Sequence, residues 1–125
     1  MRLLICGSRH WTDGELILQE LRALHAREQV EVVIEGEAPG ADTLAREAVR
    51  QLGIPVLPFP ADWEKHGRAA GPLRNQRMLD EGRPDMVLAF SEDLNSARGT
   101  ADLCARARRA GLPIHLISHV GAKSL

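Results

Sequence analysis

The sequence predicts an α/β protein whose parallel sheet is covered by helices on both faces. Five short apolar runs alternate with segments of helical periodicity along the 125 residues. The runs are apolar throughout instead of alternating with polar residues, which is typical of strands buried on both sides. Short right-handed crossovers then favour a Rossmann-like, doubly wound fold of about five parallel strands in the order 3-2-1-4-5. We expect a single domain over residues 1–125.

The first half of the chain contains three of these strands and two helices. Ile17, Leu21 and Leu24 recur at the spacing of one helix face, and Asp13 or Thr12 can cap the first turn. Prolines at both ends of the third apolar run favour a sheet edge, because proline donates no ladder hydrogen bond. The predicted strands cover residues 2–6, 31–35 and 54–59, and the predicted helices cover 14–27 and 41–52.

The second half repeats the alternation after a stretch without clear periodicity. Residues 60–70 are expected to be irregular, and residues from Ser118 onward are expected to fray. Pro72 fits the first turn of a helix. Helices are predicted at 72–81 and 99–110, strands at 85–90 and 112–117, and a polar loop at 91–98.

The composition excludes several classes of protein. The chain is 44% hydrophobic and 26% charged, the balance of a soluble globular chain. Its net charge of −1 gives no general attraction to nucleic acid or anionic lipid, so neither a nucleic-acid partner nor a membrane is expected. No apolar run approaches the roughly 18 to 20 residues of a membrane span, and no signal-peptide pattern is present, so we expect a cytoplasmic protein.

Cysteine and histidine spacing gives no sign of a metal site or a disulfide framework. Cys6 and Cys104 form no CxxC pattern and are expected in the core. The five histidines match neither HExxH nor a Cys/His ligand pattern. We therefore expect neither a bound metal nor a resident cofactor.

Glycine-rich segments follow the first two strands and open the last helix. In a doubly wound sheet, ligands bind outside the carboxyl ends of the strands, at the switch point between strands one and four. Glycine lets the backbone approach a ligand, and the first N–H groups of a helix bind anions. Turn chemistry alone can also explain each glycine. The candidate ligand-binding residues here are Gly7, Ser8, Arg9 and Trp11, then Gly36, Gly40, Ala41 and Asp42, and finally Gly99 and Thr100.

The segment from residue 60 to residue 78 supplies a second group of candidates. Trp63 is a platform on which a base can stack, and Asp62 can accept hydrogen bonds from ribose hydroxyls. Arg74 and Asn75 can hold a phosphate or the edge of a base. The alternative is a solvated loop whose tryptophan packs against the end of the sheet.

Catalytic patterns are weaker. The chain lacks GxGxxG, GxxxxGK[ST] and GxSxG, so neither a standard dinucleotide fingerprint nor a P-loop nor a serine triad is supported. Asp42 and Glu37 are weak candidates for a carboxylate that activates water. Asp42 is equally well placed to cap the helix at 41–52.

The order of these motifs resembles the YspA-like branch of the SLOG superfamily over nearly the whole chain. The resemblance rests on residues that are spread over every predicted element. They are Gly7-Ser8-Arg9 with Trp11 and Asp13, Gly40-Ala41-Asp42 with Leu44-Ala45, Ala61-Asp62-Trp63 with Gly67, Ala70-Gly71, Arg74-Asn75 and Met78, and Pro84-Asp85 with Leu88-Ala89-Phe90 and Gly99-Thr100.

The resemblance implies a Rossmann-like fold that binds a nucleotide-derived ligand, with phosphate near Gly7–Arg9, Gly36–Asp42 and the helix start at Gly99-Thr100. Two differences stand out. Glu37 follows Gly36 where the branch usually has a second glycine, and Leu103 stands where the related LOG phosphoribohydrolases have their catalytic glutamate.

Three functions follow as hypotheses. The leading one is binding of a nucleotide or nucleotide-derived small molecule by a sensor, carrier or sequestering protein. The alternative is an enzyme that hydrolyses a nucleotide's N-glycosidic bond, as the LOG enzymes do. The third is binding of single-stranded nucleic acid through Arg68, Arg74 and Arg77, as in the DprA proteins of the superfamily. Related folds commonly form homodimers, and a homodimer is a further expectation.

Overall fold

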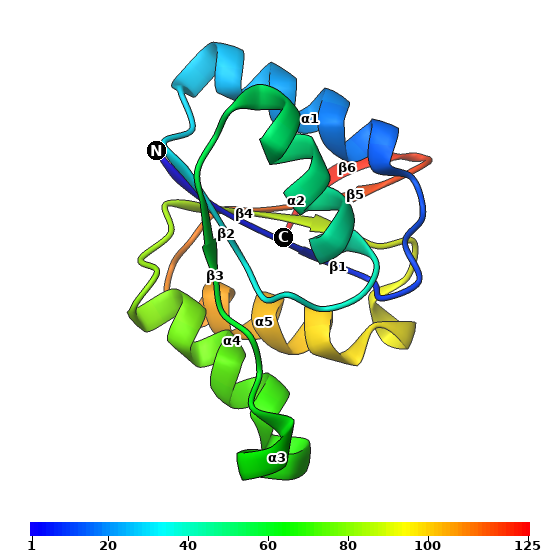
Figure 1. Cartoon of the computed structure of the whole chain (residues 1–125). Coiled ribbons are helices and arrows are strands. Elements are labelled where there is room, and N and C mark those ends of the chain that lie inside the picture. The colour runs from blue at the N-terminus through cyan, green and yellow to red at the C-terminus, as the bar shows by residue number, and fades with distance from the viewer.

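The computed structural model describes residues 1–125 and consists of one sheet between two layers of helices (Figure 1). Two short 3-10 turns, η1 (Gly67–Ala69) and η2 (Leu94–Ser96), lie in the loops. The helices are α1 (Gly14–Glu28), α2 (Ala41–Leu52), α3 (Trp63–His66), α4 (Ala70–Asp80) and α5 (Arg98–Arg109). The strands are β1 (Arg2–Gly7), β2 (Val32–Glu35), β3 (Val56–Pro58), β4 (Met86–Phe90), β5 (Ile114–Ser118) and β6 (Gly121–Ser124).

The sheet has the order β3-β2-β1-β4-β5-β6, so the predicted order of the first five strands is confirmed. These five strands are parallel, and β6 pairs antiparallel with β5. The proline-flanked strand β3 lies at one edge, as predicted, and pairs only with β2. The switch point lies between β1 and β4, whose carboxyl ends meet at the pair Gly7 and Phe90.

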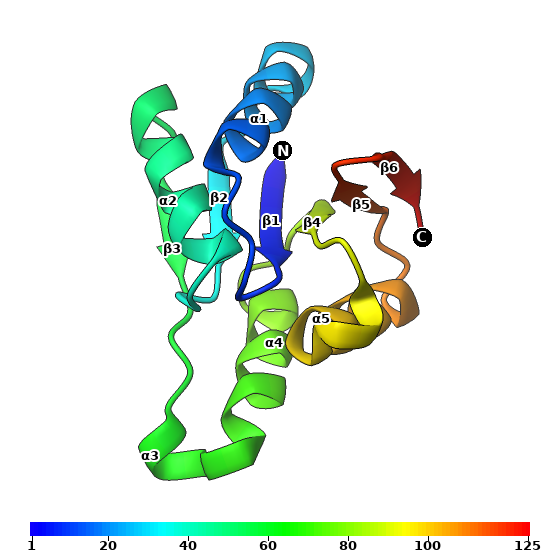
Figure 2. The same ribbon diagram turned by 90° about the vertical axis from the view of Figure 1, so that its right-hand side faces the viewer.

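Helices α1 and α2 cover one face of the sheet, and α4 and α5 cover the other (Figures 1 and 2). The alternation of side chains along β1 shows both layers of the core. Leu3 and Ile5 are fully buried in the cluster that α1 and α2 share, whereas Leu4 and Cys6 belong to the cluster under α4 and α5. Because both faces are buried, the strands are apolar at successive positions, which is the pattern seen in the sequence.

The stretch at 60–70, expected to be irregular, contains α3, η1 and the first residue of α4. The Asp62 carboxylate caps α3 by accepting the N–H of Lys65 at 3.0 Å. A four-residue helix is too short to show a helical period in the sequence, which explains the wrong prediction. This segment projects beyond α4, away from the sheet (Figure 2).

The expectation that the tail frays was also wrong, because residues 121–124 form β6. All four residues of β6 are exposed, so no apolar alternation marks the strand in the sequence. Backbone pairing with β5, from His115 opposite Ser124 to Ser118 opposite Gly121, forms it instead. None of the helices combines the length and the apolar character that crossing a bilayer requires.

Candidate functional site

A pocket of about 650 Å³ lies at the carboxyl edge of the sheet, next to the switch point between β1 and β4. Its walls come from the end of β1 and the loop after it, the loop before α2, the α3–α4 segment and the start of α5. From the amino-terminal half, the lining residues are Cys6, Gly7, Ser8, Arg9, Ala38, Pro39 and Asp42. From the rest of the chain they are Trp63, Arg68, Gly71, Pro72, Arg74, Asn75, Met78, Asn95, Ser96, Ala97, Arg98, Gly99, Thr100, Asp102 and Leu103.

The amino terminus of α5 opens onto this pocket with its backbone donors free. Ala97, the N-cap residue, gives no side-chain cap, and the first helical bond is the one from the Ala101 N–H to the Ala97 carbonyl. The N–H groups of Arg98, Gly99 and Thr100 therefore have no acceptor within the chain. The Thr100 side chain is only 6% exposed and its hydroxyl makes no hydrogen bond. Such a helix start favours an anion.

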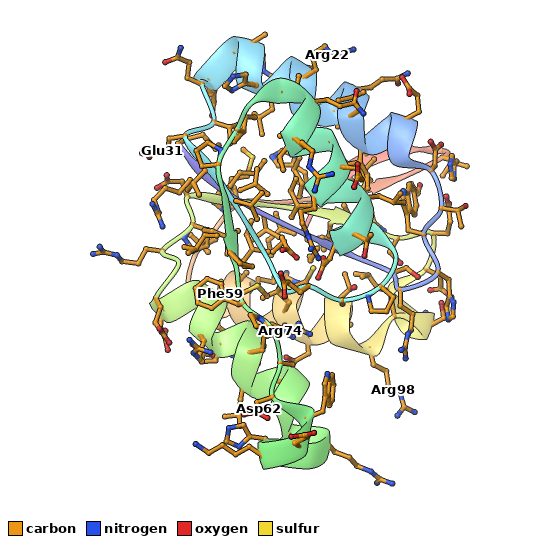
Figure 3. All side chains as sticks on the ribbon, viewed as in Figure 1. Arg22, Glu31, Phe59, Asp62, Arg74 and Arg98 are labelled. Atoms are coloured by element: carbon orange, nitrogen blue, oxygen red, sulfur yellow. The ribbon has the colours of Figure 1, made fainter.

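Three arginines around the pocket carry unpaired charge. Arg9, Arg68 and Arg98 are exposed, line the pocket, and pair with no carboxylate of the chain. Arg98 extends from the start of α5 away from the sheet (Figure 3). Free guanidinium groups close to a helix amino terminus add to its preference for an anionic ligand.

Trp63 forms an aromatic wall of the pocket. Its side chain is 59% exposed, although tryptophan is usually much more buried. One edge of the indole lies over Gly71, where a Cβ atom would come within 3.4 Å of the ring. The ring is thus supported at one edge and otherwise open to the pocket, as a stacking surface for a flat ligand requires.

The loop before α2 does not present its amides to the pocket in the way we expected. Asp42 Oδ2 accepts the N–H groups of Gly36 at 3.2 Å and Ala38 at 3.1 Å. Glu35 Oε2 accepts the N–H of Glu37 at 2.5 Å. Three successive amides are therefore used by the protein's own carboxylates, and the Ala41 N–H at the start of α2 bonds to the Ser8 carbonyl. The start of α5 has more free donors than the start of α2.

Two buried carboxyl groups lie under this loop. Glu35 is fully buried, and burial, together with the nearby charges of Asp42 and Glu37, raises its pKa to about 7. Burial also raises the pKa of Asp42 to about 6, although hydrogen bonds from Ala38 and Gly36 oppose the shift. Asp42 lines the pocket, and its Oδ1 accepts no hydrogen bond from the chain.

Arg74 and Asn75 hold the pocket walls together. Arg74 donates from Nη1 to the Gly36 carbonyl and from Nε to Asn75 Oδ1. Asn75, only 3% exposed, donates from Nδ2 to the Gly99 carbonyl at 3.1 Å and to Asp102 Oδ2 at 3.0 Å. One pair of residues on α4 therefore fixes the loop before α2 and the start of α5 relative to each other.

Two further ionisable groups of the pocket are held in fixed protonation states. Burial works against ionisation of Asp102, but hydrogen bonds from Arg106 and Asn75 outweigh it and lower its pKa. A hydrogen bond with the Cys104 thiol and burial raise the pKa of Cys6 well above its ordinary value. Cys6 is therefore a neutral thiol and not an activated nucleophile.

The structure brings most of the predicted site residues to the pocket. Five others and Glu37 do not line it. Trp11 is 5% exposed, donates from Nε1 to the Asp13 carbonyl and packs on Phe90. Asp62 caps α3. Gly40 allows a close crossing, because a Cβ there would come within 2.5 Å of the Ser8 and Arg9 carbonyl oxygens. Gly36 directly follows β2 and Ala41 is the first residue of α2, and neither lines the pocket.

Residues just before α5 and at its first position are the part of the pocket that sequence reasoning missed. Asn95, Ser96 and Arg98 fall in the stretch read as a plain polar loop. Asp93 caps η2 by accepting the Asn95 N–H at 2.9 Å, and this turn carries the following residues into the pocket wall. An aspartate two residues before an asparagine is a turn signal that could have been used.

The arginines considered for single-stranded nucleic acid do not form a common patch. Arg77 pairs with Glu81 at 2.7 Å and lies over the Phe59 ring at 5.3 Å, and Arg74 is bound to Gly36 and Asn75. Of the three, only Arg68 has a side chain that makes neither an ion pair nor a hydrogen bond with the rest of the chain. No group of three or more histidine, cysteine or acidic side chains is arranged to hold a metal ion.

A doubly wound parallel sheet with a pocket at its switch point defines this chain as a Rossmann-like α/β protein. The family model of the YspA, cpYpsA-related SLOG family (YAcAr) matches residues 1–66. The Gene 61 protein of Mycobacterium phage D29 is 40% identical over 119 residues, covering 90% of this chain and 93% of that protein. The chain therefore belongs to the YspA, cpYpsA-related SLOG family, as its motifs predict.

Proposed function

We propose that the protein binds a nucleotide-derived, phosphate-bearing small molecule in the pocket. The main support for this proposal is the start of α5, where three free backbone N–H groups meet the unpaired hydroxyl of the mostly buried residue Thr100. A phosphate placed there satisfies donors that otherwise have only water. Membership of the SLOG family supports the same class of ligand.

The remaining walls support a nucleotide over a bare phosphate. Trp63 offers a stacking surface for a base, and Asp42 Oδ1 is a free acceptor for a hydroxyl or amino hydrogen of the ligand. The cavity of about 650 Å³ falls in the size range of small-molecule sites. Because the arginines on the α4 side are mostly engaged internally, a small molecule fits the pocket better than a nucleic-acid strand does.

A thermal-shift screen tests the proposal. Nucleoside monophosphates, ADP-ribose and cyclic dinucleotides are compared with adenosine and with inorganic phosphate. A ligand that binds only the folded state at about 100 times its Kd adds about 2.7 kcal/mol of stability and raises Tm. We expect a rise with at least one phosphate-bearing nucleotide and a smaller rise with adenosine. No response across the panel, or an equal response to adenosine, would contradict the proposal.

Removing the Thr100 hydroxyl is expected to weaken binding of such a ligand about tenfold. Thr100→Val keeps the shape of the side chain but deletes a hydrogen bond to a charged group, worth about 1.5 kcal/mol. Thr43→Val is the matched control, since Thr43 lies at the start of α2 and its hydroxyl bonds to the Ala38 carbonyl. Isothermal titration calorimetry measures both variants. An equal loss in both would contradict a phosphate site at α5.

Hydrolysis of the ligand is the second candidate function, favoured by one observation. Asp42 is a buried carboxyl group in the pocket wall whose pKa is raised to about 6, as a general acid or base requires. If it acts as a base, the rate falls as pH drops through about 6, because the carboxylate is then protonated.

Asp42→Asn separates hydrolysis from binding. The amide oxygen can still accept the N–H groups of Gly36 and Ala38, so the loop is expected to keep its shape. Because an NH2 group then replaces the free Oδ1 acceptor, binding is measured separately and release is compared at saturating ligand. Chromatography of the incubated ligand measures the released base. We expect release by wild type to drop at least about a hundredfold in the variant if Asp42 is the base. Binding without any released base in wild type would leave the protein a binding module.

A further inference from the structure

A histidine in the turn between β5 and β6 connects three loops at the carboxyl edge of the sheet. His119 Nε2 lies 2.8 Å from Asp13 Oδ2, and Nδ1 contacts Glu92 Oε1. The backbone N–H of His119 also donates to Glu92 Oε1 at 3.1 Å. The imidazole stacks on the Trp11 ring, with centroids 4.9 Å apart and planes 8° apart. We call His119, Asp13, Glu92 and Trp11 the loop latch.

The geometry of the loop latch specifies its protonation state. Ionised carboxylates only accept hydrogen bonds, and a neutral imidazole has a single N–H. Both ring nitrogens of His119 face a carboxylate, so both contacts are hydrogen bonds only when the ring is the imidazolium. Hydrogen bonds with Asp13 and Glu92 accordingly raise the pKa of His119. The other ionisable residues that line the cavity beside His119 are acidic, Glu15 and Glu20, and their negative charges favour the same charged form.

Two of the three loops also form walls of the candidate site. Trp11 donates its N–H to the Ser8 carbonyl, so a fixed Trp11 holds the turn that carries Ser8 and Arg9. Glu92 directly precedes Asp93 and η2, which lead to the free start of α5. The latch itself does not line the 650 Å³ pocket. The loop latch can therefore affect the pocket only through the two loops that it connects.

We propose that the loop latch is a proton-operated device that fixes the Ser8–Asp13 loop against the Glu92–Ala97 loop and thereby makes ligand binding pH-dependent. Below the pKa of the free imidazole the ring bridges both carboxylates. As pH rises through the raised pKa of the folded state, one of the two hydrogen bonds is lost and the loops separate. The consequence for binding rests on the proposed function, whereas the latch can be tested without any ligand.

Three measurements on the full chain test the latch without ligand. NMR of the imidazole carbons, assigned with His119→Gln, gives the titration midpoint, which we expect above about 6.5. Hydrogen exchange, corrected for the intrinsic effect of pH, is expected to show about threefold less protection of both loops at about pH 9 than at about pH 6. His119→Arg stays charged and can donate to both carboxylates, so its loop protection is expected to be the same at both values.

The outcomes separate the latch from the proposed function. His66→Gln, which removes an exposed histidine outside the latch, is the matched control and should behave as wild type. A His119 midpoint at or below about 6.5, or loop protection that changes equally in His119→Arg, would overturn the latch. If the latch responds to pH but no nucleotide binds, the proposed function fails alone. If a nucleotide binds with the same pH dependence in wild type and His119→Arg, the coupling to binding is wrong.

Discussion

Gly7→Ala is expected to destabilise the fold by about 3 kcal/mol or more, because the added methyl group has no space between two packed segments. A Cβ atom at position 7 would lie 2.4 Å from the Phe90 carbonyl oxygen and 2.6 Å from the Ala41 Cβ. The first contact is with backbone of the neighbouring strand, whose oxygen also accepts the Ser8 N–H. Phe90 is fully buried, so neither side can move without repacking the core.

Gly99→Ala is the matched control for this prediction. A Cβ at position 99 meets nothing within 4 Å, and alanine is favoured over glycine in a helix. We expect its unfolding free energy to stay within about 0.5 kcal/mol of wild type. Urea unfolding followed by circular dichroism measures both variants. Equal stability of Gly7→Ala and Gly99→Ala would show that β1 and β4 are not packed as closely as described.

The same control variant informs on the site. Gly99 lines the pocket at the start of α5, where the added methyl group occupies space next to the free N–H groups. Suppose that Gly99→Ala is as stable as wild type but binds ligand more weakly. Glycine would then be needed for folding at position 7 and for binding at position 99. The sequence alone does not distinguish these two roles, because Gly7 lies at the end of a predicted strand and Gly99 at the start of a predicted helix, and both are typical glycine positions.

The fold could be predicted from the sequence because a strand that is buried on both faces has apolar residues at successive positions. The apolar run at 2–6 indicates a strand buried on both faces, and the prolines around β3 indicate a strand at the edge of the sheet. β6 has no such pattern in the sequence, because its residues are all exposed and only backbone pairing with β5 forms the strand. α3 depends on one capping contact from Asp62, whose carboxylate is also a plausible ligand group when seen only as a sequence letter.

The site was harder to predict because partners distant along the chain decide what each side chain does. Trp11 and Trp63 both occupy polar stretches, yet Trp11 is covered by Phe90 and by His119 from the end of the chain, whereas Trp63 is left open. Arg74 has the charge of a ligand contact, but its guanidinium is bound to the Gly36 carbonyl, 38 positions away. Residue type predicts chemistry only after such pairings are known.

At about pH 9, Glu35→Gln is expected to be more stable than wild type by up to about 3 kcal/mol, because the buried carboxyl of wild type is ionised at that pH. The Glu35 carboxyl is fully buried, and its Oε1 has no hydrogen bond, with Arg46 Nε 3.6 Å away. The pKa of Glu35 is about 7 in the folded protein, whereas an unburied glutamate has a pKa of 4.5. Stability from this group is thus fully present below about pH 4.5 and is lost as pH rises through about 7.

The pH dependence distinguishes this cause from a general effect of charge removal. Unfolding free energies of wild type, Glu35→Gln and the control Glu47→Gln are compared from about pH 5 to about pH 9. Glu47 is exposed on α2, where its surface pair with Arg50 contributes little. We expect the gain of Glu35→Gln to grow with pH and that of Glu47→Gln to stay near zero. A gain that is independent of pH would refute ionisation of Glu35 as its source.

The Glu35→Gln variant also tests the shape of the loop before α2 and the charge of the pocket wall. A glutamine oxygen can accept the Glu37 N–H as the carboxylate does, so the loop before α2 is expected to keep its shape. At about pH 6 the Glu35 carboxyl, with its pKa of about 7, is mostly neutral, so replacing it with a neutral amide is expected to leave the charge of Asp42 unchanged. Binding of a phosphate-bearing ligand to Glu35→Gln is therefore expected to match wild type at about pH 6, and weaker binding there would show that the loop before α2 has changed its shape.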